Sequence, residues 1–115
     1  MRQFGNWAEE YAKRYLLSEG LTLIEQNYRS RFGEIDLIMQ DARALIFVEV
    51  RARATYHYGG GLASVLVSKQ KKIMKTAALY IQKIKMHNIA AMRFDVVSID
   101  GPERKLTWIK NAFYE

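Results

Sequence analysis

Asp36 and Glu49 lie in two neighbouring apolar stretches, at 33–40 and 45–53, which are joined by the short segment 41–44. Both stretches are rich in Ile, Val, Leu and Phe, so they predict the two strands of a hairpin. If 41–44 forms the turn, Asp36 lies opposite Glu49, with Cβ atoms roughly 5 Å apart. Two facing carboxylates repel each other unless a cation lies between them. The spacing therefore favours a divalent metal site, and such sites often hydrolyse phosphodiesters.

The predicted register depends on an even turn length, since a shift of one residue would turn every side chain to the other face. It is supported by apolar pairs that it matches on one face: Ile35 with Val50, Leu37 with Val48, and Met39 with Ile46. The other face has Glu34 opposite Arg51 beside the acidic pair. An ordinary cross-strand ion pair between Glu34 and Arg51, with Asp36 and Glu49 in solvent, is the alternative. Asp is disfavoured within strands, which supports the metal-site interpretation of Asp36.

The composition indicates one globular domain that spans residues 1–115, with half of its residues apolar. The chain has no cysteine, which excludes disulfides and thiolate metal ligands. His57 and His87 are its only imidazoles. A metal site would therefore use mainly carboxylate oxygens, which favours Mg²⁺ or Mn²⁺.

The charge balance favours a polyanionic partner, because 18 Lys and Arg against 12 Asp and Glu give a net charge of +6. No apolar run approaches the length of a membrane-spanning helix, and the first residues lack the apolar core of a signal peptide. We therefore expect a cytoplasmic protein that is not inserted in a membrane.

The order of predicted elements indicates an α/β fold, because a hairpin is followed by a helix that can cross over to a further strand. Helical spacing predicts two helices, and the second should bury Ile73, Met74, Ala77, Ile81 and Ile84. Ser68 can cap its start. The predicted segments are a helix at 6–18, strands at 21–29, 33–40 and 45–53, a helix at 68–87, and strands at 92–100 and 105–113. We expect a mixed sheet flanked by helices.

This order resembles the restriction-endonuclease-like, or PD-(D/E)xK, superfamily, whose core is αβββαβ. Its signature is an acidic residue on the second strand and (D/E)-x-K on the third. Asp36 matches the first element, and Glu49-Val50-Arg51 matches the second except for its last residue.

Over nearly the whole chain the sequence is similar to the YraN-like family of bacterial proteins. The matching segments are Gly5 with Glu9-Glu10-Tyr11-Ala12 and Tyr15-Leu16, Asn27-Tyr28-Arg29, GEIDLI at 33–38, FVEVRAR at 47–53, Ser68-Lys69 with Lys72, and RFDVV at 93–97. The resemblance implies a nuclease-like domain in which Asp36 and Glu49 hold Mg²⁺ or Mn²⁺.

Two further residues acquire roles from the resemblance. Glu9 matches an acidic residue on the first helix of many nuclease-like folds, where it completes the metal site. Alternatively, Asn6 and Glu9 have the spacing of a capping box. Arg51 stands where the superfamily has lysine. Arginine stays protonated and cannot act as a general base, but it can hold a phosphate oxygen or stabilise transition-state charge.

The start of the 68–87 helix is rich in lysine, with Lys69, Lys71, Lys72 and Lys75. Lys69, in the family-like Ser-Lys pair, is our candidate to replace the strand lysine. The group could bind backbone phosphates, or it could be a solvated helix face. No acidic residue lies between Ser68 and Asp95, which favours phosphate binding.

The segment 54–64 is irregular in sequence and contains three consecutive glycines. Its Tyr56 and His57 could contact nucleic acid by stacking on bases, or the loop could pack on the sheet. Asp95 is interpreted as a structural partner for an arginine.

Three functions remain open from the sequence. The first is a metal-dependent endonuclease on DNA, which analogy with Holliday-junction resolvases extends to branched recombination and repair intermediates. The second is a nucleic-acid-binding module that keeps the nuclease fold without cleaving, which Arg51 favours. The third is a protein-interaction module whose basic helix docks an acidic partner. Many nucleases of this fold dimerise, so a homodimer is compatible with the resemblance, although no interface patch is evident.

Overall fold

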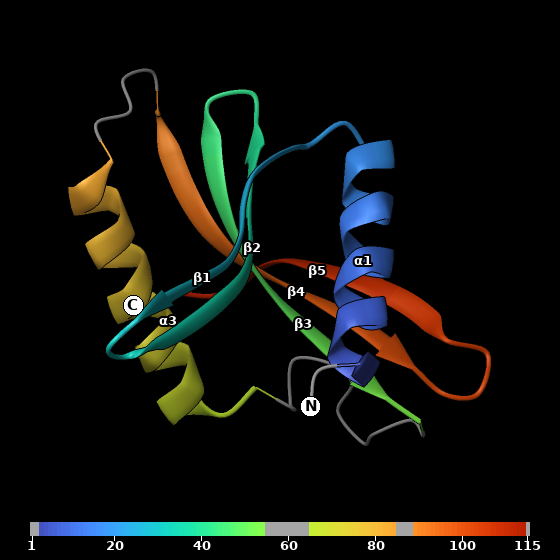
Figure 1. Cartoon of the computed structure of the whole chain (residues 1–115). Helices are drawn as coiled ribbons and strands as arrows, with labels where there is room; N and C mark the ends of the chain where they lie inside the picture. The colour runs from blue at the N-terminus through green and yellow to red at the C-terminus, as the bar shows by residue number, and fades with distance from the viewer. Residues whose placement is uncertain (1–2, 55–64, 85–88, 115) are drawn as a thin grey trace.

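The computed structural model describes residues 3–54, 65–84 and 89–114, and side chains from residue 7 onward within them. Within these residues, two helices and five strands follow the order αβββαβ and then add one strand (Figure 1). They are α1 (Gln3–Ser18), β1 (Thr22–Ser30), β2 (Gly33–Asp41), β3 (Ala44–Arg53), α3 (Val67–Lys83), β4 (Ala91–Asp100) and β5 (Lys105–Phe113). The predicted α/β class is confirmed.

The five strands form one mixed sheet in the order β1-β2-β3-β4-β5. All neighbours are antiparallel except β3 and β4, which run parallel because α3 carries the chain back between them. The two helices lie on opposite faces of the sheet (Figure 1). The C-terminal end of β3 and the first turns of both helices lie toward the bottom of that view. Side chains from both faces can therefore meet at this end of the sheet.

The predicted hairpin register is confirmed, because Gln40 pairs with Leu45 and Leu37 pairs with Val48. The turn is shorter than the predicted four residues, since Asp41 and Ala44 also pair. Pairing between β2 and β3 runs from this turn only as far as Leu37 and Val48. Asp36 and Glu49 therefore lie just past the last backbone pair.

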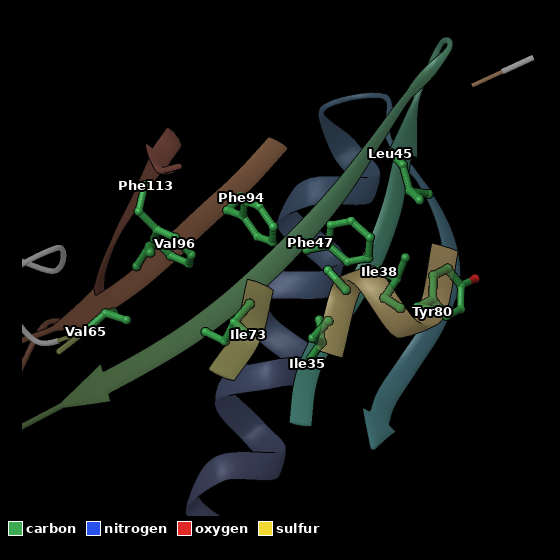
Figure 2. Close-up of a cluster of buried hydrophobic side chains, with 11 residues drawn as sticks. Ile35, Ile38, Leu45, Phe47, Val65, Ile73, Tyr80, Phe94, Val96 and Phe113 are labelled. Atoms are coloured by element: carbon green, nitrogen blue, oxygen red, sulfur yellow. The ribbon is translucent and has the colours of Figure 1, made fainter. Parts of the chain in front are cut away.

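Two cores form, one on each face of the sheet. The α1 core contains Ala8, Ala12, Leu16, Leu21, Leu37, Met39, Ile46, Val48, Val97 and Ile99. The α3 core includes Phe47, whose ring meets those of Tyr80 and Phe94, with centroids 6.1 and 5.5 Å away (Figure 2). The prediction that Ile35 shares the face of Leu37 and Met39 is wrong. Ile35 packs in the α3 core, because strict alternation fails where β2 leaves its partner.

The buried stripe of α3 is displaced from the predicted one. Thr76 and Tyr80 are buried with Ile73 and Ala77, whereas Ile81 is 38% exposed. Helix α3 has apolar residues on more of its surface than the part that faces the sheet. Only those that face the sheet are buried.

Two expectations about helix starts are also wrong. Helix α1 begins at Gln3, so Asn6 lies inside it and is not its N-cap. Leu66 occupies the N-cap position of α3, which makes Ser68 an internal residue, and no side chain caps this helix start. Within the described residues, neither helix is long and apolar enough to cross a membrane.

Candidate active-site cleft

A cleft of about 360 Å³ lies at the end of the sheet where β2 and β3 stop pairing. Four acidic residues line it: Glu9 from α1, Glu34 and Asp36 from β2, and Glu49 from β3. Three cationic residues join them: Arg51 and Arg53 from β3, and Lys69 from α3. Both described helices and the neighbouring strands β2 and β3 therefore contribute charge to one cleft.

Asp36 binds the neighbouring strand through its side chain. Its Oδ2 accepts a hydrogen bond of 2.8 Å from the main-chain N–H of Val50, which supplies this N–H with an acceptor just past the end of the β2–β3 pairing. Burial raises the pKa of Asp36 well above its usual value, and the negative charge of Glu49 raises it further. Glu9 and Glu34 add to the rise in pKa, while the Val50 hydrogen bond opposes it. The site therefore disfavours the ionised form of Asp36 unless a cation is present.

Glu49 is 4% exposed and receives two cations on the same oxygen. Arg51 Nη1 lies 3.4 Å and Lys69 Nζ 3.7 Å from Glu49 Oε2. Burial raises the pKa of Glu49, whereas Lys69, Arg51 and a hydrogen bond with Asp36 lower it. The other oxygen, Oε1, is buried and has no hydrogen-bond partner among the described residues. A buried carboxylate oxygen without a partner is costly, so Oε1 is a ready ligand position.

Glu9 reaches the cleft from the opposite face of the sheet. It is 6% exposed, and its Oε1 accepts a hydrogen bond of 3.0 Å from Asn27 Nδ2. Asn27 lies on β1 with a φ of 55°, a left-handed backbone that asparagine tolerates better than most residues. Asn27 thus positions Glu9, a role that sequence reasoning did not assign although Asn27 belongs to a quoted motif.

The four predicted phosphate-binding lysines do not share one surface. Lys69 approaches Glu49, whereas Lys71 and Lys75 line a separate groove of about 420 Å³ beside Met74 and Tyr114. Lys72 is exposed, with its Cβ close to Gly33. The predicted nucleic-acid contacts Tyr56 and His57 lie outside the described residues.

Asp36 and Glu49 are the residues that would hold a divalent cation in this cleft. Asp36 and Glu49 supply hard oxygen ligands, which Mg²⁺ and Mn²⁺ prefer, and Glu49 Oε1 lacks another partner in the described chain. Within the described residues no three carboxylates or imidazoles are already arranged around one common point. Glu9 would therefore need to move, or act through a water, to complete such a site.

The comparison with protein families matches residues 8–99 to the model described as "Uncharacterised protein family UPF0102". The chain belongs to the UPF0102 family. This is the YraN-like family that the motifs indicated. The UPF0102 match includes every charged residue that lines the cleft.

Curated relatives carry the same UPF0102 name. A UPF0102 protein of Legionella pneumophila strain Philadelphia 1 is 50% identical over 109 residues, which cover 95% of this chain and 92% of the relative. One from Herminiimonas arsenicoxydans is 49% identical, with 94% of this chain and 84% of the relative covered. One from Vibrio parahaemolyticus is 41% identical, with 99% and 94% covered. The similarity thus extends over nearly the full length of each protein.

Further buried polar contacts in this UPF0102 chain stabilise the sheet beside the cleft. Asp95 accepts hydrogen bonds from Arg93 Nε at 3.0 Å and Trp108 Nε1 at 2.9 Å, so its interpretation as an arginine partner is confirmed. Arg53 bonds Ser98 and Asp100, an arrangement that sequence reasoning missed. The partners are 45 and 47 residues away in the sequence, so no local pattern could have indicated them.

Proposed function

We propose that this protein hydrolyses phosphodiester bonds in DNA with Mg²⁺ or Mn²⁺ bound by Asp36 and Glu49. The observation that supports the proposal best is the unpartnered oxygen of Glu49, since two cations engage Oε2 while Oε1 stays buried without a hydrogen bond in the described chain. Asp36 lies beside it with a raised pKa. Such a pair gains most from a bound cation, which removes the cost of two buried like charges.

Each cleft residue has a distinct part in this proposal. Asp36 and Glu49 hold the metal, with Glu9 as a third, outer carboxylate fixed by Asn27. When bound, a divalent metal polarises the scissile phosphate and lowers the pKa of an attacking water. Arg51 stabilises charge that develops on the phosphate and does not take a proton.

Lys69 takes the place of the lysine that the superfamily pattern has on the third strand. It comes from α3 and not from β3, yet its Nζ lies 3.7 Å from Glu49. A lysine beside a carboxylate in a partly enclosed cleft can hold a phosphate or orient a water. Lys69 of α3 therefore supplies the amine that the superfamily pattern has at the position of Arg51 on β3.

A second candidate function, nucleic-acid binding without cleavage, is favoured by the ion pair between Arg51 and Glu49. A permanently charged guanidinium 3.4 Å from a metal-ligating carboxylate competes with the metal for it. In that case the cleft would bind phosphates through cationic side chains such as Arg51 and Lys69, without a metal. Titration calorimetry with Mn²⁺ distinguishes the two functions, because only hydrolysis needs the metal site.

The direct test is an assay of purified protein on branched, single-stranded and linear DNA, with and without Mn²⁺. We expect Mn²⁺-dependent cleavage that Asp36→Asn abolishes. The matched control is Asp41→Asn, which changes an exposed acid at the far end of the same strand. Failure to cleave any of the three substrates, together with no Mn²⁺ binding, would reject hydrolysis.

A further inference from the structure

Arg53, the last residue of β3, lines the same cleft as Asp36 and Glu49. Side chains alternate along a strand, so Glu49, Arg51 and Arg53 project on the same side of β3. All three line the same cleft. Arg51 and Arg53 are two residues apart, which corresponds to a backbone separation of about 6.6 Å along the strand.

Arg53 is held in place by two residues of β4. The parallel register sets Arg53 beside Asp100 and Arg51 beside Ser98. Arg53 Nε donates to Asp100 Oδ1 at 2.7 Å, and Arg53 Nη2 donates to Ser98 Oγ at 3.1 Å. The Ser98 hydroxyl in turn donates to Asp100 Oδ2. Ser98 is fully buried and Asp100 is 8% exposed, so the guanidinium is fixed before any ligand arrives.

One nitrogen of this fixed guanidinium remains unused. Arg53 Nη1 is buried and has no hydrogen-bond partner among the described residues. Leaving a buried donor unsatisfied costs about 1–3 kcal/mol, and more when the group is charged. Arg53 lines the cleft, so a ligand that enters the cleft could supply the missing acceptor. A phosphate oxygen is the acceptor that best suits a guanidinium N–H.

We propose that Arg53 binds the phosphate next to the scissile one, with Ser98 and Asp100 as its positioning residues. This proposal rests on the nucleic-acid binding in the proposed function. It adds a second phosphate subsite to that function. The cleft then has cations for two successive phosphates: Arg51 with Lys69 for the first, and Arg53 for the second. This arrangement selects a continuous strand over an isolated phosphate group.

Arg93 provides a matched control for this proposal. It also pairs with an aspartate, Asp95, at 3.0 Å, and its Nη2 is likewise buried without a hydrogen bond in the described chain. Arg93 does not, however, line the cleft that contains Arg53. Removing either guanidinium deletes one positive charge and one ion pair with a buried aspartate, and Arg53 additionally loses its hydrogen bond to Ser98.

The experiment measures binding of a short fluorescein-labelled single-stranded DNA by wild type, Arg53→Gln and Arg93→Gln, in EDTA and in Mn²⁺. Fluorescence anisotropy is recorded between about 50 and 200 mM salt. We expect Arg53→Gln to weaken binding about tenfold. Its slope of log K against log salt should fall in magnitude by about 0.7, the value for one phosphate contact on a single strand. Arg93→Gln should keep the wild-type slope.

A slope and affinity for Arg53→Gln equal to those of Arg93→Gln would overturn the proposal and leave Arg53 as a structural residue. If Arg53→Gln does not fold, Arg53→Lys and Arg93→Lys replace the pair, because lysine keeps the charge beside each aspartate. A several-fold loss of affinity only in Arg53→Lys supports the subsite, and equal affinities reject it. Loss of DNA binding in Arg53→Gln, with neither Mn²⁺ binding nor Mn²⁺-dependent cleavage by wild type, would reject hydrolysis and retain the subsite.

Discussion

The carboxylate of Asp36 accepts a hydrogen bond of 2.8 Å from the main-chain N–H of Val50, just past the point where β2 and β3 stop pairing. One side chain thus takes the place of a backbone carbonyl in holding the two strands together. The same bond fixes the Asp36 carboxyl beside Glu49 and burial raises its pKa. Asp36 therefore has a structural duty and a proposed metal-binding duty, which substitutions can separate.

We predict that Asp36→Asn raises the melting temperature of the metal-free protein at pH 7. The amide oxygen can still accept a hydrogen bond from Val50 N–H, and the amide stays neutral without holding a proton, whereas burial and Glu49 oppose ionisation of Asp36. In wild type, Mn²⁺ should then raise the melting temperature by several degrees, since a ligand that binds only the folded state stabilises it. The variant should not respond. Thermal melts in EDTA and in Mn²⁺ measure both effects, and a lower melting temperature for Asp36→Asn in EDTA would contradict the argument.

We predict that the metal-free stability of wild type falls as the pH rises above about 4. Asp36 and Glu49 both have pKa values raised above the usual 3.8 and 4.5, so the folded protein holds their protons after the unfolded chain has lost them. Over that interval the folded state binds more protons, and the unfolding free energy decreases with pH. Above the raised pKa values it levels off. Chemical denaturation in EDTA should show a flatter profile for Asp36→Asn, and equal profiles would count against the raised pKa values.

Local sequence patterns were sufficient to predict the order of the elements and the hairpin register, although α1 begins at Gln3 and not at 6, and α3 ends at Lys83 and not at 87. Two apolar strands that alternate in the same way and are joined by a short turn can pair in only a few registers. The pairing of Leu37 with Val48 follows from this restriction. Alternation within the two strands does not show that their pairing ends at Leu37 and Val48. That is why Ile35 was assigned to the wrong core and why the bond from Val50 to Asp36 was not predicted.

Residues whose partners are distant in sequence were the ones missed. Tyr80 and Ile81 are neighbours on α3, and Tyr80 is the buried one because its ring packs against Tyr28 and Phe47, which are distant in sequence. Arg53 likewise depends on Asp100, 47 residues away. By contrast, Lys69 was selected from a motif, and the structure brings it within 3.7 Å of Glu49.

We predict that Glu9→Gln lowers Mn²⁺ affinity about tenfold, as loss of an outer partner of a metal site typically does. The glutamine oxygen can keep the bond from Asn27, so the substitution tests the charge of Glu9 and not its packing. Glu10→Gln is the control, because Glu10 is on the same helix but pairs with Lys13 and Arg14. Titration calorimetry gives both affinities. An unchanged affinity for Glu9→Gln would leave Glu9 as a structural acceptor for Asn27.

We predict that Arg51→Lys increases the rate of Mn²⁺-dependent DNA cleavage. Lysine restores the superfamily pattern and offers an amine that can orient water or exchange a proton, which a guanidinium cannot do. It also makes a weaker competitor for Glu49 than the arginine that now lies 3.4 Å away. Single-turnover cleavage of a labelled duplex compares the two proteins. If the variant instead loses all activity, Arg51 has a bidentate role that lysine cannot replace.

We predict that substitution of Lys69 affects the cleavage rate, whereas substitution of Lys71 and Lys75 affects only DNA binding. Lys69 lies in the cleft, so Lys69→Gln should reduce the cleavage rate even at saturating DNA. Lys71 and Lys75 line the groove on another side of α3, so neutralising both should leave that rate unchanged. The double variant should instead lower the salt dependence of duplex binding by about 1.8, the value for two phosphate contacts. Cleavage at saturation and anisotropy at several salt concentrations measure the two quantities. A wild-type salt slope in the double variant would show that this side of α3 does not contact DNA.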